Sequence, residues 1–156
     1  AARVRDINPD CKVQTHEVFF LPENADVWDF SCYDYVVDAV DTVSAKIALI
    51  QKAKEVGVPV ISCMGTGNKM RPDGLEVADI AKTSVCRWER VMRRELKKRG
   101  IEHCKVVYSK EQPYKNDCVD GETGKPIPAS IAFVPPAAGL LLAAEVVADL
   151  LKKGVK

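Results

Sequence analysis

Two aspartates and a lysine stand close together where an apolar stretch gives way to a helical pattern. In residues 33–46, YDYVVDAVDTVSAK, Asp38 lies inside the apolar part, Asp41 lies at its end, and Lys46 follows five positions later. Carboxylate oxygens suit Mg²⁺, and ligands of open α/β sheets bind beyond the carboxyl ends of the strands. Asp41 is therefore a candidate ligand for a hydrated magnesium ion.

Each of these three residues also has a structural interpretation. Asp41 or Thr42 could cap the following helix, which is compatible with metal binding. Asp38 needs hydrogen-bond partners inside a buried strand, where strict alternation points it to the face opposite Asp41. It could be a core aspartate satisfied by backbone amides or a nearby base. Lys46 could be an ordinary solvated helix residue.

Hydrophobic periodicity predicts alternating strands and helices in one domain. The near-continuous apolar run at 33–40 is typical of a strand that is covered on both faces. With a helix over 43–56 and a strand over 58–64, it predicts a βαβ unit with parallel strands and a right-handed crossover. Further strands are expected at 12–20, 75–80 and 105–109, and further helices from 83 or 84 to 99 and over 137–151.

Two segments read as loops. Residues 65–69, GTGNK, follow a strand but lack the spacing of either glycine-rich nucleotide loop, so we interpret them as a turn whose backbone amides could line a cleft. Residues 111–128 are polar and contain proline, glycine and aspartate throughout, which predicts a flexible loop. The helix expected over 137–151 is apolar nearly all round, which favours a core helix or a subunit contact.

Composition excludes several classes of protein. The 156 residues carry a net charge of +1, so bulk charge indicates no partner. Six cysteines without a C-x-x-C pair, and only two histidines, argue against a zinc site and favour buried thiols in a reducing cytoplasm. The polar N-terminus is no signal peptide, and the longest apolar run is too short for a bilayer and contains Glu145 and Asp149, so we expect no membrane association.

The strongest charge signal lies in residues 82–99, with eight basic residues against two acidic ones. Helical spacing places an inward apolar face on Trp88, Val91, Met92 and Leu96. The helix is either a solvated amphipathic helix or one that contacts nucleic-acid phosphates, whose binding falls steeply with salt. The outward basic face consists of Arg87, Arg90, Arg94 and Lys97.

Three segments together resemble the ThiF/HesA/MoeB family, the bacterial relatives of ubiquitin-activating (E1) enzymes. They are VDAVDT at 37–42 with Lys46, VPVISCMGTGNK at 58–69, and VADIAKTS at 77–84. Within the family the likeness is greatest to the branch of tRNA threonylcarbamoyladenosine dehydratases, and residues 79–84 and the basic helix distinguish this branch. The resemblance implies an α/β fold, a three-layer Rossmann-like mixed sheet that forms the C-terminal part of an E1-like adenylation domain.

The resemblance also implies an activity. Family members use ATP and Mg²⁺ to adenylate a carboxylate, which in the dehydratase branch belongs to threonylcarbamoyladenosine at position 37 of tRNA and closes to a cyclic form as AMP leaves. The catalytic, magnesium-binding aspartate of the family maps onto Asp41, and Asp38 and Lys46 map onto other cofactor-binding positions. The partner implied is tRNA, for which the outward basic face is the candidate contact, and the expected assembly is a homodimer.

Other features of the family are missing from the 156 residues. Its glycine-rich ATP loop, its ribose-binding acidic residue and an arginine-bearing segment precede the motif at 37–42, and Thr42 replaces the usual asparagine. Residues 1–7 read as the end of a helix. We therefore expect residues 1–156 to be a single partial domain of a longer enzyme, and this part alone to be inactive with ATP.

Two other functions remain open at this point. The parent could activate a sulfur-carrier or ubiquitin-like protein, with a sulfur-carrier protein or a cysteine desulfurase system as partner. The chain could instead be a non-catalytic dimerisation module that uses its apolar helix at 137–151.

Overall fold

The computed structural model describes residues 1–84, 87–124 and 127–154. A four-stranded sheet lies at its centre, in the order β1-β2-β4-β3. The three strands β1, β2 and β4 are parallel, and β3 pairs antiparallel with β4 at one edge. The strands are β1 (Val36–Asp38), β2 (Val60–Cys63), β3 (Leu75–Asp79) and β4 (Lys105–Ser109).

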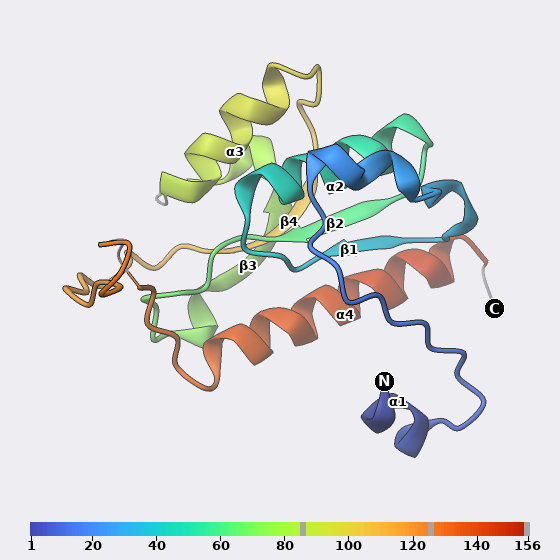
Figure 1. Ribbon diagram of the computed structural model, residues 1–156, viewed down its shortest axis with the longest axis horizontal. Helices are drawn as coiled ribbons and strands as arrows, with labels where there is room; N and C mark the ends of the chain where they lie inside the picture. The colour runs from blue at the N-terminus through green and yellow to red at the C-terminus, as the bar shows by residue number, and fades with distance from the viewer. Residues whose placement is uncertain (85–86, 125–126, 155–156) are drawn as a thin grey trace.

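Helices cover both faces of this sheet (Figure 1). On one face lie α2 (Val43–Glu55) and α3 (Arg87–Lys97), and on the other lies α4 (Val134–Lys152). The predicted α/β fold with three layers and a mixed sheet is confirmed. Shorter elements are α1 (Ala2–Ile7) and the 3-10 helices η1 (Pro22–Val27), η2 (Phe30–Cys32), η3 (Pro72–Gly74) and η4 (Ile80–Lys82).

Alternation along the strands divides the core into two parts. Val106 packs with Ile50, Met92 and other residues on the side of α2 and α3, whereas its neighbour Val107 packs with residues of α4. Successive strand side chains point to opposite faces, so one short apolar strand can fill both layers. The parallel pairing of β1 with β2 also brings the carboxyl ends of these strands to one edge, where the polar segments after them meet.

Some elements differ from the sequence-based expectation. Residues 12–20 form no strand, because the part of the chain that the structure describes places no strand beside them to share backbone hydrogen bonds, and Phe19 is 86% exposed. The strand expected over 33–40 is only the three residues of β1. Helix α4 begins before residue 137, with Pro135 and Pro136 in its first turn, where a missing N–H costs no helical hydrogen bond.

Polar side chains attach α4 to the sheet. Lys105 Nζ donates to Glu145 Oε2 at 2.9 Å and to Asp149 Oδ2 at 2.6 Å, and the Tyr35 hydroxyl donates to the same Asp149 oxygen at 2.8 Å. By length and composition alone this 19-residue helix could cross a membrane, so the expectation that the apolar run is too short is wrong. One such helix is weak evidence of a span, and both acidic residues of α4 are here bound to the sheet.

This attachment should make stability depend on pH. Hydrogen bonds from Lys105 and Tyr35 hold the pKa of the Asp149 carboxyl below its ordinary value. A lowered folded-state pKa stabilises the fold above the unfolded pKa of about 3.9, and this contribution is lost as pH falls through the folded pKa. We expect Asp149→Asn to cost about 1 kcal/mol at pH 7 and almost nothing at the acid end of a series of denaturant titrations.

The control is Asp73→Asn, which removes an exposed carboxylate paired with Arg71 and should change the unfolding midpoint little. A cost for Asp149→Asn that stays constant down to the lowest pH would contradict the ion-pair explanation.

Candidate functional site

A pocket of about 770 Å³ lies beyond the carboxyl ends of β1, β2 and β4. Open α/β sheets bind their ligands at this edge. Its walls come from the segment after β1, the turn after β2 and the long segment between β4 and α4, together with side chains of α2, α3 and α4. The lining residues include Asp41, Lys46, Cys63, Gly65, Gly67, Asn68, Lys69, Trp88 and Pro128.

Asp41 is exposed and lines this pocket. Thr42 is the N-cap residue of α2, and its side chain makes no capping hydrogen bond. Among the described residues, the Asp41 carboxylate has no hydrogen-bond or ion-pair partner, so it caps nothing. Its oxygens are available to a ligand in the pocket.

Asp38 lies at the end of β1 and is fully buried. Its carboxylate accepts hydrogen bonds from the Ser62 hydroxyl, from Lys46 Nζ at 3.0 Å and from the Val40 amide at 3.1 Å. The predicted need for partners is thus met by a base and a hydroxyl as well as one amide. Because Val40 belongs to the turn before Asp41, Asp38 also positions the candidate metal ligand.

The interpretation of Lys46 as a solvated residue is wrong. Its side chain is buried, and Nζ donates to Cys63 O at 2.6 Å in addition to Asp38. The strict alternation assumed between Asp38 and Asp41 does not apply either, since β1 ends at Asp38. Lys46 is therefore the charge partner of a core aspartate at the floor of the pocket.

The turn after β2 contributes a lysine that sequence reasoning missed. Lys69 is only 2% exposed, and Nζ donates to Ser109 O at 3.2 Å as its one hydrogen bond within the described residues. The segment had the appearance of a polar turn. Only the pairing of β2 with β4 places Ser109 beside it.

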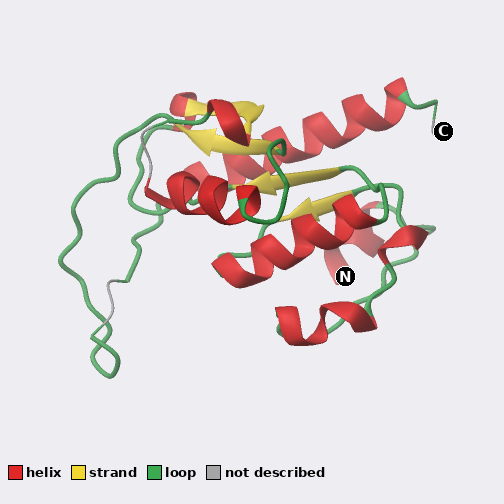
Figure 2. Ribbon diagram, turned by 90° about the horizontal axis from the view of Figure 1, so that it is seen from above, coloured by secondary structure: helices red, strands yellow, loops and turns green. Residues whose placement is uncertain are grey.

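Asn68 joins this turn to the segment before α4. Its backbone amide donates to Ala129 O at 2.6 Å, its side-chain oxygen accepts from Ala129 N at 2.8 Å, and its carbonyl accepts from Tyr114 N at 2.8 Å. Asn68 adopts a left-handed φ of 57°, which asparagine tolerates better than most residues. A Cβ on Gly67 would lie 2.9 Å from Pro128 Cβ. The long loop before α4, which extends away from the body of the molecule in Figure 2, is thus anchored to the turn after β2 at Ala129 and Tyr114.

Helix α3 is rotated relative to the expected orientation. Trp88, predicted to point inward, is 44% exposed and lines the pocket, whereas Glu89 is completely buried. The inward stripe is Glu89, Met92 and Leu96, at helical spacings of three and four. The indole instead packs over Gly65, where a Cβ would lie 3.9 Å from its ring.

Glu89 is an anomaly, because neither carboxylate oxygen has a hydrogen-bond partner within residues 1–84, 87–124 and 127–154. A buried polar group without a partner costs about 1–3 kcal/mol on the evidence of mutations. We therefore expect Glu89→Met to raise the free energy of unfolding by about that amount, read from denaturant titrations. Glu95→Met is the control on the same helix and should destabilise, since Glu95 accepts bonds from Lys98 and Arg99. A loss of stability in Glu89→Met would show that the carboxylate has a role in the fold.

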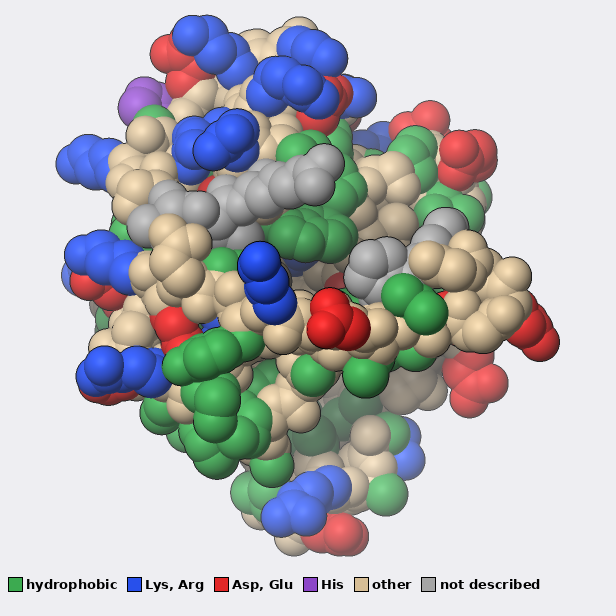
Figure 3. Space-filling model, turned by 90° about the vertical axis from the view of Figure 1, so that its left-hand side faces the viewer, with side chains coloured by type: hydrophobic (Ala, Val, Ile, Leu, Met, Phe, Trp, Pro, Cys, Tyr) green, Lys and Arg blue, Asp and Glu red, His purple; other side chains and the backbone are tan. Residues whose placement is uncertain are grey.

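The outward basic residues of α3 lie where the sequence predicts. Arg90, Arg94 and Lys97 are exposed, and the side chain of Arg87 lies outside the described residues. Lysine and arginine side chains gather over the end of the molecule that holds α3 (Figure 3). Glu95 bonds Arg94, Lys98 and Arg99, and bonds from Lys98 and Arg99 hold the pKa of its carboxyl below the ordinary value. Among the described residues, Arg90 and Lys97 have no carboxylate partner.

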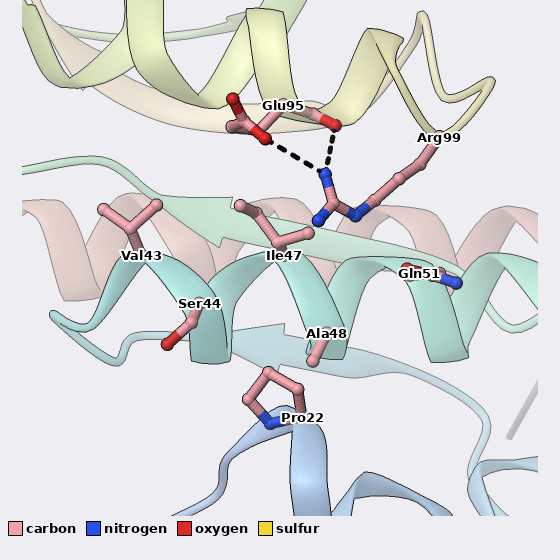
Figure 4. Close-up of a pocket in the computed structure, with 8 residues that line it drawn as sticks. All are labelled: Pro22, Val43, Ser44, Ile47, Ala48, Gln51, Glu95 and Arg99. Atoms are coloured by element: carbon pink, nitrogen blue, oxygen red, sulfur yellow. Dashed lines mark hydrogen bonds and ion pairs between the residues drawn. The ribbon is translucent and has the colours of Figure 1, made fainter.

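A second hollow of about 450 Å³ lies between η1, α2 and α3 (Figure 4). Its floor includes Val43, Ile47 and Pro22. The guanidinium of Arg99 donates to the backbone oxygen of Glu95 at 2.8 Å and to its carboxylate at 3.2 Å. The charged groups of this hollow therefore bind one another, and we assign it no chemistry.

The oxygen ligands available in the pocket beyond the strand ends fit a magnesium ion that is also bound by phosphates. Within the described ranges no three His, Cys, Asp or Glu residues cluster as a metal cage. Mg²⁺ in nucleotide sites usually takes one or two carboxylates, with water and phosphate oxygens completing the octahedron. The carboxylate of Asp41, unpartnered among the described residues, would supply one such ligand.

Comparison with known proteins gives consistent results. The model of the ThiF family matches residues 1–156. The chain is 38% identical over 162 residues to the tRNA threonylcarbamoyladenosine dehydratase of Bacillus subtilis, covering 97% of the chain and 64% of that relative. It is 37% identical over 83 residues to the dehydratase of Escherichia coli, covering 53% of the chain and 31% of that relative.

Solved structures of the Escherichia coli tRNA N6-threonylcarbamoyladenosine dehydratase superpose with a TM-score of 0.83. One is a complex with AMP, at 26% identity over 98% of the chain and 63% of the neighbour. Another is a complex with ATP, at 25% identity over 98% of the chain and 62% of the neighbour. The chain thus spans a little less than two thirds of the first relative's length.

Proposed function

The chain belongs to the ThiF family, and from that premise we propose that it forms part of an ATP-dependent enzyme that cyclises threonylcarbamoyladenosine in tRNA. The observation that carries this proposal is the pocket at the carboxyl ends of the strands, into which Asp41 presents an unpartnered carboxylate. The likeness to tRNA threonylcarbamoyladenosine dehydratases, of which the Escherichia coli protein is solved with ATP and with AMP, supports the choice of substrate. A cytoplasmic enzyme without membrane association remains part of the proposal.

In the proposed reaction a carboxylate oxygen of the substrate attacks the α-phosphorus of ATP, and pyrophosphate leaves. The carbamoyl group then attacks the activated carbonyl, and AMP leaves with the former carboxylate oxygen while one proton is released. A bound Mg²⁺ would neutralise charge on the triphosphate. Asp41 would hold that ion, and Asp38, fixed by Lys46 and Ser62, would keep the turn before Asp41 in place.

The test is product formation. The enzyme is incubated with ATP, Mg²⁺ and tRNA that carries threonylcarbamoyladenosine, and the nucleosides are then analysed by mass spectrometry. We expect the modified nucleoside to lose the mass of one water, with one AMP and one pyrophosphate released per product. ATP–pyrophosphate exchange that depends on a sulfur-carrier protein, without any cyclised nucleoside, would support the rival activator of such proteins.

We also propose that the glycine-rich nucleotide loop of the family is supplied by sequence outside these 156 residues. The relatives exceed the chain in length, which supports this proposal. The 156-residue chain by itself should then show no ATP–pyrophosphate exchange, and measurable exchange by the chain alone would overturn it.

The basic face of α3 is proposed to bind tRNA phosphates. Replacing Arg90, Arg94 and Lys97 together by alanine should lower the slope of log affinity against log salt by about three, or about one for each phosphate that the helix no longer neutralises. Filter binding at several salt concentrations measures this slope. The control replaces the exposed Arg3, Arg5 and Lys12 by alanine; these residues belong to α1 and the segment after it, and α1 lies far from α3 (Figure 1). Equal slopes in both triple variants would remove α3 from the interface.

A homodimer is proposed to form through the outer face of α4. Leu140, Val147 and Leu151 are 73%, 56% and 69% exposed on this face, with Ala143 and Ala144 between them. A contiguous apolar face of this kind favours a protein contact. Molar mass by light scattering tests the proposal, and a monomer at all concentrations would contradict it.

A further inference from the structure

We infer that Lys69 and Trp88 form the substrate end of the pocket. The ammonium of Lys69 binds the carboxylate of the substrate nucleoside, and the indole of Trp88 stacks on its base. This inference rests on the proposed function and assigns residues to its substrate.

The ammonium of Lys69 has unused donors inside the protein. It has three N–H donors, and the described residues offer it one acceptor, Ser109 O at 3.2 Å. At 2% exposure a cation is costly to bury unless an anion or further acceptors meet it. Since Lys69 lines the pocket, an anion bound there can supply both the charge and the missing acceptors.

The neighbouring charges leave this cation uncompensated. Lys46, the other buried lysine of the pocket, is paired with Asp38 at 3.0 Å and also bonds Cys63 O. Lys69 has no carboxylate within ion-pair distance among the described residues. Lys46 and Asp38 cancel, so in the part of the chain that the structure describes Lys69 is the unpaired cation of the pocket, and Asp41 is its unpaired anion.

The order of strands separates this cation from Asp41. Asp41 follows β1, and Lys69 bonds the end of β4, with β2 between them. Neighbouring strands are about 4.8 Å apart, so the ends of β1 and β4 lie about 10 Å apart along the edge of the sheet. Asp41 suits the metal and the phosphates, and Lys69 suits an anion of the second substrate. The nucleoside side chain of the proposed substrate ends in such a carboxylate.

Trp88 supplies an aromatic surface beside the cation. Its indole lies over Gly65 and is 44% exposed at the pocket. Enzymes that modify a base take it out of the stack, and an unstacked base gains about 1–3 kcal/mol on an aromatic side chain. Trp88 belongs to α3, the helix whose exposed Arg90 and Arg94 are the proposed phosphate contacts. The helix α3 would thus bind the phosphates of the tRNA and also stack on the modified base.

The test compares three small probes: N6-threonylcarbamoyladenosine, adenosine and ATP. Trp88 fluorescence reports binding in a Trp28→Phe variant of the 156-residue chain, in which Trp28 is the only other tryptophan. We expect both nucleosides to quench Trp88, with the carboxylate-bearing nucleoside binding about 10- to 100-fold more tightly, as for a charge-assisted hydrogen bond. Lys69→Met should abolish this preference and leave the affinity for adenosine unchanged, and Lys69→Arg should restore part of it.

The matched control is Lys110→Met. Lys110 directly follows Ser109, the residue at the end of β4 that Lys69 bonds. Its Nζ is paired with Glu76 at 2.6 Å, and it does not line the pocket. This variant should keep the full preference for the carboxylate. Thermal unfolding checks that both lysine variants are folded.

Three results would overturn the inference. The first is an unchanged preference in folded Lys69→Met, and the second is a loss of ATP affinity in that variant with the nucleoside preference intact, which would make Lys69 a phosphate ligand. The third is a failure of both nucleosides to quench Trp88 fluorescence in the Trp28→Phe protein that still carries Lys69.

The same measurements keep this inference distinct from the proposed reaction. If carboxylate binding depends on Lys69 but the enzyme forms no cyclised nucleoside, the proposed reaction is refuted and the inferred binding site for the nucleoside still stands. If the enzyme forms the cyclised nucleoside but its preference for the carboxylate is the same with and without Lys69, the proposed reaction is supported and the inferred role of Lys69 is refuted.

Discussion

Replacement of Asp41 by alanine is expected to lower the rate of cyclisation of tRNA-bound threonylcarbamoyladenosine by about 10²-fold or more. The reason is the loss of a ligand to the magnesium ion that stabilises charge on the triphosphate, an electrostatic contribution of the size found when one preorganised group is removed. Stability should change little, because the Asp41 carboxylate is exposed and bonds none of the described residues. Single-turnover rates and thermal unfolding are measured on the same preparations.

The control for Asp41→Ala is Asp34→Ala, which removes an exposed carboxylate before β1, at the opposite end of that strand. It should have the rate of the unaltered enzyme. A near-normal rate for Asp41→Ala, with a loss of stability of about 1 kcal/mol, would instead identify Asp41 as a helix cap in solution. The two interpretations of Asp41 therefore predict opposite changes in rate and stability.

Replacement of Lys46 by methionine is expected to cost about 3–5 kcal/mol of the free energy of unfolding. Methionine fills most of the space of the lysine stem, so the main effect is a buried Asp38 carboxylate without its charge partner. Denaturant titration measures the loss. The control is Lys52→Met, which breaks a surface pair with the exposed Asp26 and should have a much smaller effect.

A double variant separates charge from packing. Asp38→Asn combined with Lys46→Met removes both charges, and we expect it to be more stable than Lys46→Met alone. If the double variant is the less stable of the two, the cost does not arise from the unpaired charge. A side-chain amide in place of the Asp38 carboxylate cannot match every bond that the carboxylate accepts, so the turn before Asp41 should loosen. The cyclisation rate should then fall even where the fold is recovered.

The elements that the sequence predicted well have strong local signals. The helix expected over 43–56 is α2, and the strand expected over 105–109 is β4, because apolar residues recur there with the period of a helix or fill a short strand. Residues 12–20 carry a similar strand pattern but form no strand. A strand needs a neighbour for its backbone groups, and no local pattern reports whether one is present.

The candidate site was predictable only in part. The place of Asp41 between the first strand and the following helix follows from the change of period in residues 33–46, and Asp41 lines the pocket beyond β1. The burial of Lys46 was not predictable in this way, because its partners Asp38 and Cys63 come from two different strands. The same holds for α3, whose charges indicate an exposed helix but do not settle whether Trp88 or Glu89 faces inward.

By itself, the sequence determined the βαβ unit, the aspartate between its first strand and its helix, the basic helix and the likeness to the ThiF family, since each depends on residues close together in the chain. The tertiary structure alone decided which charges are neutralised. The strand order β1-β2-β4-β3 places Ser109 beside Lys69, forty residues away, and encloses Lys69 without a carboxylate partner among the described residues. Burial and pairing are properties of the assembled layers, and they distinguish the lysine that supports the fold from the one available to a substrate.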